Sequence, residues 1–427
     1  MSQGALPGFR DFYPDQLATR NYLTGVWRDV ARRYGFVEYD GPPLEPLELY
    51  TKKSGDEIVG QLYAFTDKGE REVALRPEMT PTLARMVAAR ANALRKPIRW
   101  FSIPQLFRYE RQQRGRLREH FQLNVDIVGE TSVAADAELL AVAIDVMRTV
   151  GLTAKDVRAR VSDRGLLTAI LASVGVASDS MAAVFAAIDK AGREPREVTL
   201  DKIGKIVGVG EAHASIARLL EKSTDLEAVA ARFGKAPPVA AEIAQMREYL
   251  RLLDALGVGD WVDFDLSIVR GLAYYTGKVF ELFDAKGELR AICGGGRYDD
   301  LLSTIGDVDL PALGFGMGDV VLSDLLRSRN LLPEPDLATE YWVAGEDDSL
   351  LAEVMSVAGK LRARNRSVEY SLKPQTLARQ LKTASSAGVR SVVLVRRDDY
   401  LKGRVTVKTL ADGSERNVPI TDFLESL

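Results

Sequence analysis

The most unusual segment of this sequence is an arginine-rich run between Arg108 and Arg118. It reads RYERQQRGRLR, with five arginines and one glutamate, and HFQLNVDIVG follows it. Arginine presents a rigid, permanently charged fork of N–H donors that suits phosphate oxygens. A solvated basic hairpin is the alternative for a generic run of this kind. Here Phe107, Phe121 and Leu123 flank the run and would fix it on a buried sheet, which favours a phosphate site.

Two further segments carry polar groups that could take part in binding. In SIVRGLAYYTG, Arg270 directly precedes a glycine, and Tyr274 and Tyr275 follow inside strand-forming sequence. The alternative is that the tyrosines pack in the core while the arginine reaches out to solvent. In LRPEMT, Glu78 and Thr80 stand where a strand leads into a helix, so they could equally serve as cap or first-turn groups.

Other kinds of chemistry find little support in the sequence. One cysteine, Cys293, cannot form an internal disulfide or a thiolate zinc site. The two histidines, His120 and His213, are far apart, which disfavours a catalytic triad or a two-histidine metal face. The Walker phosphate pattern is absent, and GFGMG at 314–318 lacks the full dinucleotide-binding spacing and favours close helix packing. Any chemistry must therefore use arginine, carboxylates, glutamine, tyrosine and backbone groups.

Length and composition indicate a globular protein of two or three domains. The chain has 427 residues, of which 46% are apolar and 27% charged, with a net charge of −3. No run approaches the ~18 apolar residues of a membrane span. The N-terminus lacks the basic and apolar stretches of a secretory signal, so we expect a cytoplasmic protein.

The elements that would position these groups follow from hydrophobic periodicity. The pattern predicts a helix over 16–35, a hairpin around the turn at 68–69, a helix over 80–93, and paired strands at 98–110 and 120–129 that bracket the arginine-rich loop. This order predicts an α+β fold, because the regular strand–helix alternation of a doubly wound sheet is missing.

The rest of the chain changes character twice. Residues 153–260 are rich in Ala and Leu at helical spacing, and they predict a helical insertion. Strand patterns then resume, and a helix over 313–330 closes the large domain. A proline-containing linker at 331–340 precedes alternating strands and helices, which predict a small α/β domain. From Tyr341 onward this part holds 14 Lys/Arg against 11 Asp/Glu, a local balance of +3.

Taken together and in this order, these segments resemble the histidyl-tRNA synthetase family, which belongs to the class II aminoacyl-tRNA synthetases. LPGFRDFYPDQ is similar to the N-terminal strand and turn of the family, YGFVEYDGPPLEP to motif 1, and LRPEMTP to its LRPE-x-T loop. FRYERQQRGRLREHFQLNVDIVG matches motif 2 in residues and spacing. IVRGLAYYTGKVFE and GGGRYDDLL resemble the stretches that distinguish the histidine enzymes, and the tail resembles an anticodon-binding domain.

The resemblance implies a class II antiparallel sheet flanked by helices, with a helical insertion and a C-terminal α/β anticodon-binding domain. The expected parts are a catalytic domain at 1–152 (motifs 1 and 2) and 261–330 (histidine-specific motifs and the motif 3 region), the insertion at 153–260 and the anticodon-binding domain at 338–427. Motif 1 builds a twofold interface in the family, so a homodimer is expected.

The implied activity is that of a histidine–tRNA ligase, which converts L-histidine and ATP to histidyl-adenylate and then charges tRNA(His). Mg²⁺ would accompany ATP, and no metal bound by the protein itself is implied. Arg108 and Arg270 would be catalytic, Arg116 would reach the outer phosphates, Glu110 would meet the adenine amino group and Phe121 would stack on adenine. The implied histidine-binding residues are Glu78, Met79, Thr80, Arg108, Gln122, Asp126, Arg270, Tyr274, Tyr275 and Tyr298. The implied ATP-binding residues are Arg108, Glu110, Arg116, Phe121 and Arg270.

The sequence departs from the family pattern at two positions. Val321 occupies the place of the motif 3 arginine, and Ala273 stands where many members have aspartate. The sequence does not identify whether Arg297 or another cation compensates. Two alternatives therefore stay open. One is a catalytically silent regulatory subunit of ATP phosphoribosyltransferase, although such relatives generally lack the C-terminal domain. The other is a class II ligase for a different amino acid.

Overall fold

The computed structural model describes residues 4–51, 59–110, 115–191, 194–269, 275–287, 289–306 and 308–427. The chain forms two compact units, Met1–Pro333 and Glu334–Leu427, each with its own core. Arg270, Ala273 and Tyr274, which the sequence analysis singles out, lie outside the described residues. In the part of the chain that is described, no helix is both long and apolar enough to cross a membrane.

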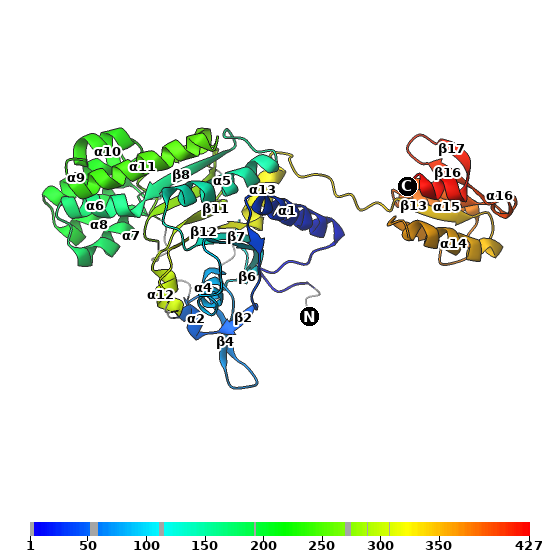
Figure 1. The fold of residues 1–427 in the computed structure, drawn as a ribbon, viewed down its shortest axis with the longest axis horizontal. Helices are drawn as coiled ribbons and strands as arrows, with labels where there is room; N and C mark the ends of the chain where they lie inside the picture. Colours follow the sequence, from blue (N-terminus) through cyan, green and yellow to red (C-terminus); the bar gives the residue numbers. More distant parts are fainter. Residues whose placement is uncertain are drawn as a thin grey trace. The chain divides into compact units, whose positions relative to one another are not determined.

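A nine-stranded sheet forms the centre of the first unit (Figure 1). The strand order is β1-β5-β7-β12-β11-β10-β8-β9, and β6 also pairs with β7. The pairs β1–β5 and β8–β9 are parallel, and the other pairs are antiparallel. The α+β fold class is confirmed. The strands are β1 (Val37–Glu38), β5 (Ile98–Ser102), β6 (Gln105–Phe107), β7 (Glu119–Val128), β8 (Val157–Asp163), β9 (Val262–Phe264), β10 (Lys278–Asp284), β11 (Cys293–Arg297) and β12 (Ala312–Gly318).

Strand β7 has one face in the core and one face toward a second layer of side chains. Leu123, Val125 and Ile127 are fully buried against helices α1 (Pro14–Arg33) and α5 (Val133–Thr149). Successive strand residues point to opposite faces, so the even-numbered residues of β7 face away from these helices. On that other face, α4 (Thr80–Ala88) and α12 (Leu301–Gly306) contact the sheet through a smaller apolar cluster. The two layers leave polar β7 side chains between the sheet and α4.

Local sequence explains the ends of the predicted elements. Helix α1 begins at Pro14, where the side chain of Gln16 accepts a hydrogen bond from the Tyr13 backbone N–H, and it ends just before Gly35 at φ 75°. The predicted hairpin is confirmed, because β3 (Tyr63–Thr66) pairs with β4 (Glu72–Leu75). Strand β4 also pairs with β2 (Leu44–Pro46), and the short helix α2 (Glu48–Thr51) follows β2.

The boundaries of the helical insertion differ from the prediction. Residues 157–163 form β8, a strand of the main sheet between β10 and β9, so the first part of 153–260 does not belong to the insertion. The Asp163 side chain then accepts hydrogen bonds from the N–H groups of Gly165 and Leu166 and starts the first insertion helix. The helices are α6 (Arg164–Ser173), α7 (Met181–Ile188), α8 (Arg196–Val207), α9 (Glu211–Glu221), α10 (Leu226–Phe233) and α11 (Pro237–Ala255).

The helix predicted over 313–330 is wrong in its first third. Residues 312–318 form strand β12, which lies between β7 and β11, and helix α13 (Asp319–Ser328) begins only after Gly318. Glycine occupies alternate positions in β12 because the β7 side chains need the space. A Cβ on Gly314 would collide with the carboxylate of Asp126, and a Cβ on Gly316 would lie 2.8 Å from Cδ of Gln122. The glycines therefore make room for two of the predicted site residues.

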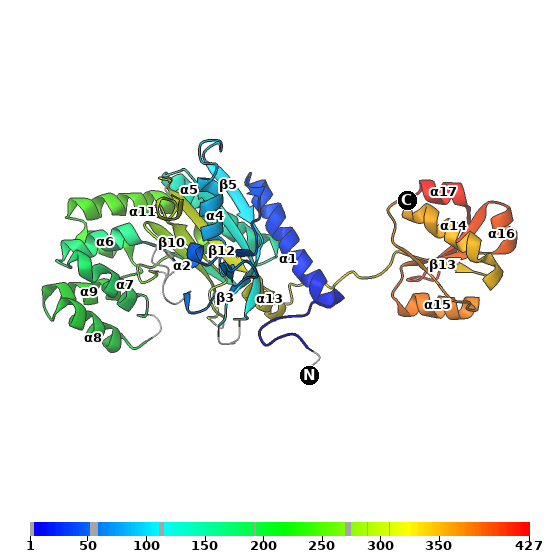
Figure 2. The same cartoon turned by 90° about the horizontal axis from the view of Figure 1, so that it is seen from below.

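The second unit is a five-stranded sheet with helices on both faces. Its strand order is β14-β13-β15-β16-β17. Helices α14 and α17 cover one face, and α15 covers the other, as Figure 2 shows. The elements are β13 (Tyr341–Gly345), α14 (Leu351–Arg362), β14 (Val368–Tyr370), α15 (Leu377–Ser386), β15 (Ser391–Val395), α16 (Arg397–Leu401), β16 (Arg404–Thr409), β17 (Glu415–Pro419) and α17 (Ile420–Glu425). The predicted C-terminal α/β domain is confirmed.

Candidate active site

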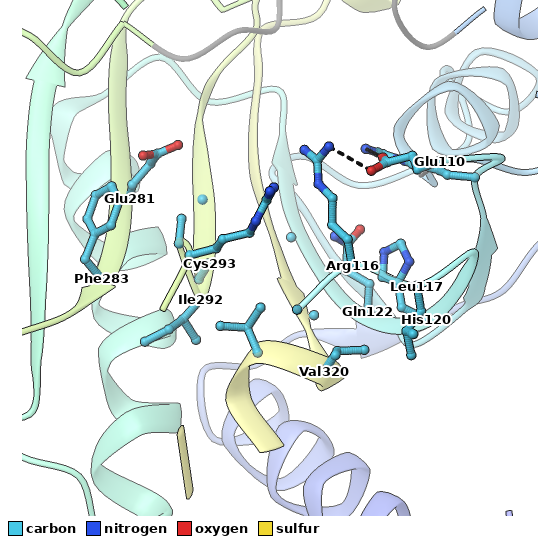
Figure 3. A pocket seen from close by; sticks show the side chains of 18 residues that line it. Glu110, Arg116, Leu117, His120, Gln122, Glu281, Phe283, Ile292, Cys293 and Val320 are labelled. Atoms are coloured by element: carbon cyan, nitrogen blue, oxygen red, sulfur yellow. Dashed lines mark ion pairs between the residues drawn. The ribbon is translucent and has the colours of Figure 1, made fainter. Parts of the chain in front are cut away.

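A cavity of about 630 Å³ opens at the end of the main sheet where α13 begins. Figure 3 shows its two sides: Glu281, Phe283 and Cys293 come from β10 and β11, and Glu110 and Arg116 lie across from them. A volume of this size is typical of small-molecule sites. The lining residues are Arg108, Glu110, Gly115, Arg116, Leu117, His120, Gln122, Glu281, Phe283, Arg290, Ala291, Ile292, Cys293, Gly294, Gly316, Gly318, Val320 and Val321.

The arginine-rich segment supplies the charged side of this cavity. The guanidinium of Arg116 pairs with the carboxylate of Glu110 at 2.8 Å (Nη1 to Oε2), and Nη1 of Arg108 lies 3.9 Å from Oε1 of the same residue. Nε of Arg108 donates to the carbonyl oxygen of Pro77 at 2.9 Å. That bond brings the arginine segment next to Glu78, which is buried at the start of α4. Two of the predicted segments therefore meet at Arg108.

A buried polar pair lies farther along β7, on the same face. The hydroxyl of Tyr298 donates to Oδ1 of Asp126, and both residues are almost completely buried. Burial raises the pKa of the Asp126 carboxyl to about 7, although the hydrogen bond from Tyr298 opposes the rise. Asp126 lies four positions after Gln122 on β7, so about 13 Å of strand joins this pair to the cavity wall. The strand thus connects a charged opening to a buried hydrogen-bonding group.

The remaining described residues of the predicted histidine-binding set lie at helix α4 or in the apolar cluster that it shares with the sheet. Tyr275 and Tyr298 share one apolar cluster with residues of α4. Met79 is buried directly before α4, and Thr80 is half-buried as its first residue. The structure brings the described members of the predicted set to one side of the main sheet.

The placement of Phe121 differs from the prediction that it stacks on adenine. Its ring points to the opposite face of β7, where it makes an edge contact with Phe12 at 6.1 Å and lies under the guanidinium of Arg20 at 4.6 Å. Its backbone N–H donates to Oδ1 of Asp319 at 3.0 Å. Gln122 and Phe121 are neighbours on one strand, so both cannot face the cavity.

His120 lines the cavity in place of Phe121. Burial, together with the charges of Arg108 and Arg10, lowers the pKa of the His120 imidazole to about 3. The ring is therefore neutral at physiological pH and presents an uncharged aromatic surface beside Gln122. The strand period could have identified His120, because it lies two residues from Gln122 and shares its face.

Known proteins similar to this chain identify its family. The sequence model described as histidyl-tRNA synthetase matches residues 8–319, and the one described as anticodon binding domain matches residues 341–427. The chain belongs to the histidyl-tRNA synthetase family. A curated histidine–tRNA ligase of Opitutus terrae is 43% identical over 97% of this chain and 95% of its own length. The chloroplastic/mitochondrial histidine–tRNA ligase of Arabidopsis thaliana is 42% identical over 97% of this chain and 85% of its own length.

Solved structures support the fold. The crystal structure of histidyl-tRNA synthetase from Nostoc sp. PCC 7120 superposes with a TM-score of 0.82 at 24% identity, covering 100% of this chain and 99% of that chain. The predicted family and its class II fold, with a C-terminal anticodon-binding domain, are therefore confirmed.

The departure from the synthetase pattern at Val321 has a structural counterpart. Val321 lines the cavity at the start of α13, next to Val320. Arg297 does not compensate for the missing arginine, because it forms a bidentate ion pair with Asp136 at 3.1 and 2.8 Å and donates to the carbonyl oxygen of Glu130. Among the described residues that line the cavity, the cations are Arg108, Arg116 and Arg290.

Proposed function

We propose that this chain is a histidine–tRNA ligase that activates L-histidine with ATP and transfers the histidyl group to the 3′ end of tRNA(His). Family membership and curated relatives of this name over nearly the full chain support the proposal. The single observation that carries it in the structure is strand β7, which joins an arginine-lined cavity to the buried Asp126–Tyr298 pair. The first suits a nucleotide, and the second suits a small polar ring.

ATP would occupy the cavity. Arg108 would hold the α-phosphate and the histidine carboxylate together, Arg116 would bind the outer phosphates, and Glu110 would accept a hydrogen bond from the adenine amino group. In this arrangement His120, rather than Phe121, offers the aromatic surface for the base. Reaction of the carboxylate oxygen with the α-phosphorus forms the adenylate and releases pyrophosphate. No side-chain nucleophile is needed, because positioning and stabilisation of phosphate charge account for the rate.

Histidine would bind at the buried end of β7. A neutral imidazole has one N–H donor and one acceptor nitrogen, so it requires hydroxyl, amide or carboxylate partners. Asp126 and Tyr298 supply such groups. Gln122 lines the cavity and Glu78 follows Pro77, to which Arg108 bonds, so the ammonium group would lie near them. Met79, Thr80 and Tyr275 would complete the walls of this pocket. Arg270 keeps its expected catalytic role and Tyr274 its expected role in histidine binding, and both lie outside the described residues.

Mg²⁺ would be carried mainly by the phosphates of ATP. In the described part of the chain, no group of three His, Cys, Asp or Glu side chains could hold a metal ion. Glu281 lines the cavity and offers a carboxylate, the kind of oxygen ligand that Mg²⁺ accepts together with substrate phosphates and water. When bound, the ion would neutralise phosphate charge.

The other partners follow from the same proposal. The C-terminal unit would bind tRNA(His), and its excess of basic residues would favour the RNA backbone. A homodimer is proposed from motif 1, whose strand β1 lies at the edge of the sheet with Val37 exposed. We expect a cytoplasmic enzyme, because charging of tRNA supplies translation.

ATP–pyrophosphate exchange with each of the twenty amino acids is the first test. Exchange with histidine alone, followed by charging of tRNA with labelled histidine, is the expected result. Exchange with a different amino acid would reject the assignment of the histidine pocket. Histidine binding without exchange or charging would favour the regulatory-subunit alternative. The anticodon-binding domain at 341–427 argues against that alternative.

A further inference from the structure

One cation of the cavity comes from a segment without any predicted role. Arg290 lies in the connection between β10 and β11, next to Ala291 and Ile292, and all three line the cavity. Figure 3 shows that Ile292 and Cys293, which follow it, lie across the cavity from Arg116. Arg290 therefore enters the cavity from the side opposite the arginine-rich segment.

The geometry around Gly115 places Arg290 close to Arg116. A Cβ built on Gly115 would lie 3.3 Å from Cγ2 of Val321 and 4.0 Å from Cδ of Arg290. Three separate segments thus meet at the residue that directly precedes Arg116. Because the guanidinium group of an arginine lies beyond its Cδ, Arg290 and Arg116 can reach one anion between them.

The net positive charge of Arg108 and Arg116 is reduced by a nearby carboxylate, so a further cation would strengthen the binding of phosphate in the cavity. Glu110 pairs with Arg116 at 2.8 Å and lies near Arg108, so this carboxylate offsets part of the charge of both arginines. Val320 and Val321, the residues of α13 that line the cavity, are apolar and supply no cation there. A triphosphate with several negative charges is bound best where guanidinium groups approach it from more than one side.

We infer that Arg290 binds the outer phosphates of ATP together with Arg116, and that it supplies the positive charge that Val321 does not. This inference rests on the proposed function, since it assumes that the cavity receives ATP. It also gives the reason why valine is tolerated at position 321: the side chains of residues 290 and 321 both approach Gly115, from different elements.

Equilibrium binding tests the inference without requiring a choice of amino acid. Calorimetric titration with ATP and, separately, with AMP should be compared for the wild type, Arg290→Ala and Arg290→Lys. We expect Arg290→Ala to raise the Kd for ATP at least tenfold. The Kd for AMP should rise less than twofold, because AMP lacks the outer phosphates. The ATP affinity of Arg290→Lys should lie between those of the wild type and Arg290→Ala, since lysine keeps the charge and loses the planar fork of donors. Lys286→Ala is the matched control: it removes an exposed cation from the same connection, outside the cavity lining.

A transplanted arginine makes the test specific. In the double variant Arg290→Ala/Val321→Arg, ATP affinity should recover at least threefold over Arg290→Ala. The reason is that residue 321, like Arg290, lies beside Gly115. Unchanged ATP affinity in Arg290→Ala, or an equal loss for AMP and ATP, would overturn the inference. Wild-type protein that binds ATP through Arg290 but shows no histidine-dependent exchange would reject the proposed function alone. Absence of ATP binding in the wild type would reject both.

Discussion

The two ends of strand β7 differ in how firmly their side chains are held. At the open end, which faces the cavity, Arg116 has a side chain that is 43% exposed and pairs with Glu110. At the buried end, Asp126 and Tyr298 are 4% and 2% exposed and are hydrogen-bonded to each other. Electrostatic attraction at the open end is long-ranged and adaptable, whereas hydrogen bonds at the buried end are short-ranged and require exact geometry.

This difference suggests a division of tasks between the ends. An open arginine cluster can accept a large, flexible triphosphate and release pyrophosphate. A buried hydrogen-bonded pair can select a ring of one size and polarity, because an ill-fitting ligand would disturb these hydrogen bonds without replacing them. Substitutions at the two ends should therefore affect different kinetic parameters.

The largest effect is expected for Arg108→Ala, since Arg108 lines the cavity and also bonds to Pro77, next to Glu78. Loss of its guanidinium should lower kcat/KM for pyrophosphate exchange about 10²–10³-fold, the usual cost of removing a donor that stabilises transition-state charge. Arg327→Ala removes an exposed arginine paired only locally with Asp324, so it is the matched control. A loss confined to the KM for ATP, with kcat unchanged, would contradict a catalytic role for Arg108.

A second experiment perturbs only the buried end. In Gly314→Ala the added methyl would collide with the carboxylate of Asp126, and we expect the free energy of unfolding to fall by about 2 kcal/mol. Gly25→Ala is the opposite case, because this helical glycine of α1 has no atom within 4 Å of an added Cβ. In this control the free energy of unfolding, measured in urea, should rise by about 0.5–1 kcal/mol. Equal stability of the two variants would mean that the Asp126 site relaxes freely.

A smaller effect is expected for Tyr298→Phe, which removes one hydroxyl from the buried end. The Asp126 carboxyl loses its hydrogen-bond donor, and a bond of this kind contributes about 1–2 kcal/mol. We therefore expect the KM for histidine to rise about tenfold while the KM for ATP stays within twofold. Tyr13→Phe, at an exposed tyrosine, should change neither value. Parallel increases in both KM values would show that the two ends are not independent.

The sequence predicts which residues come together where one continuous segment carries them, and it does so less well where several strands meet. Arg108, Glu110, Arg116 and Gln122 share one continuous motif, and all line one cavity. Arg290 is about 170 residues farther along the chain, and only the pairing of β11 with β12 and β12 with β7 brings it close. No local pattern encodes such an approach.

The fold shows the same limits. The amphipathic helix α1 and the hairpin of β3 and β4 follow from periodicity and turn residues, and the structure confirms them. The sequence does not predict strand β12, because glycine disfavours strands and the spacing of GFGMG indicates helix packing. The glycines are there for Asp126 and Gln122, so a tertiary requirement overrides the local preference.

The smallest effect is expected for His120→Phe. With its pKa lowered to about 3, the His120 ring does not take up a proton between pH 6 and 9, so it acts as a neutral flat surface. Replacing one aromatic ring by another should leave the KM for ATP within threefold at each pH in this range. His120→Ala removes the surface and should raise that KM about tenfold, since stacking of a base on an aromatic side chain contributes about 1–3 kcal/mol. If His120→Phe fails as badly as His120→Ala, the imidazole nitrogens rather than the face of the ring contact the nucleotide, and the open end of β7 is more selective than its exposure suggests.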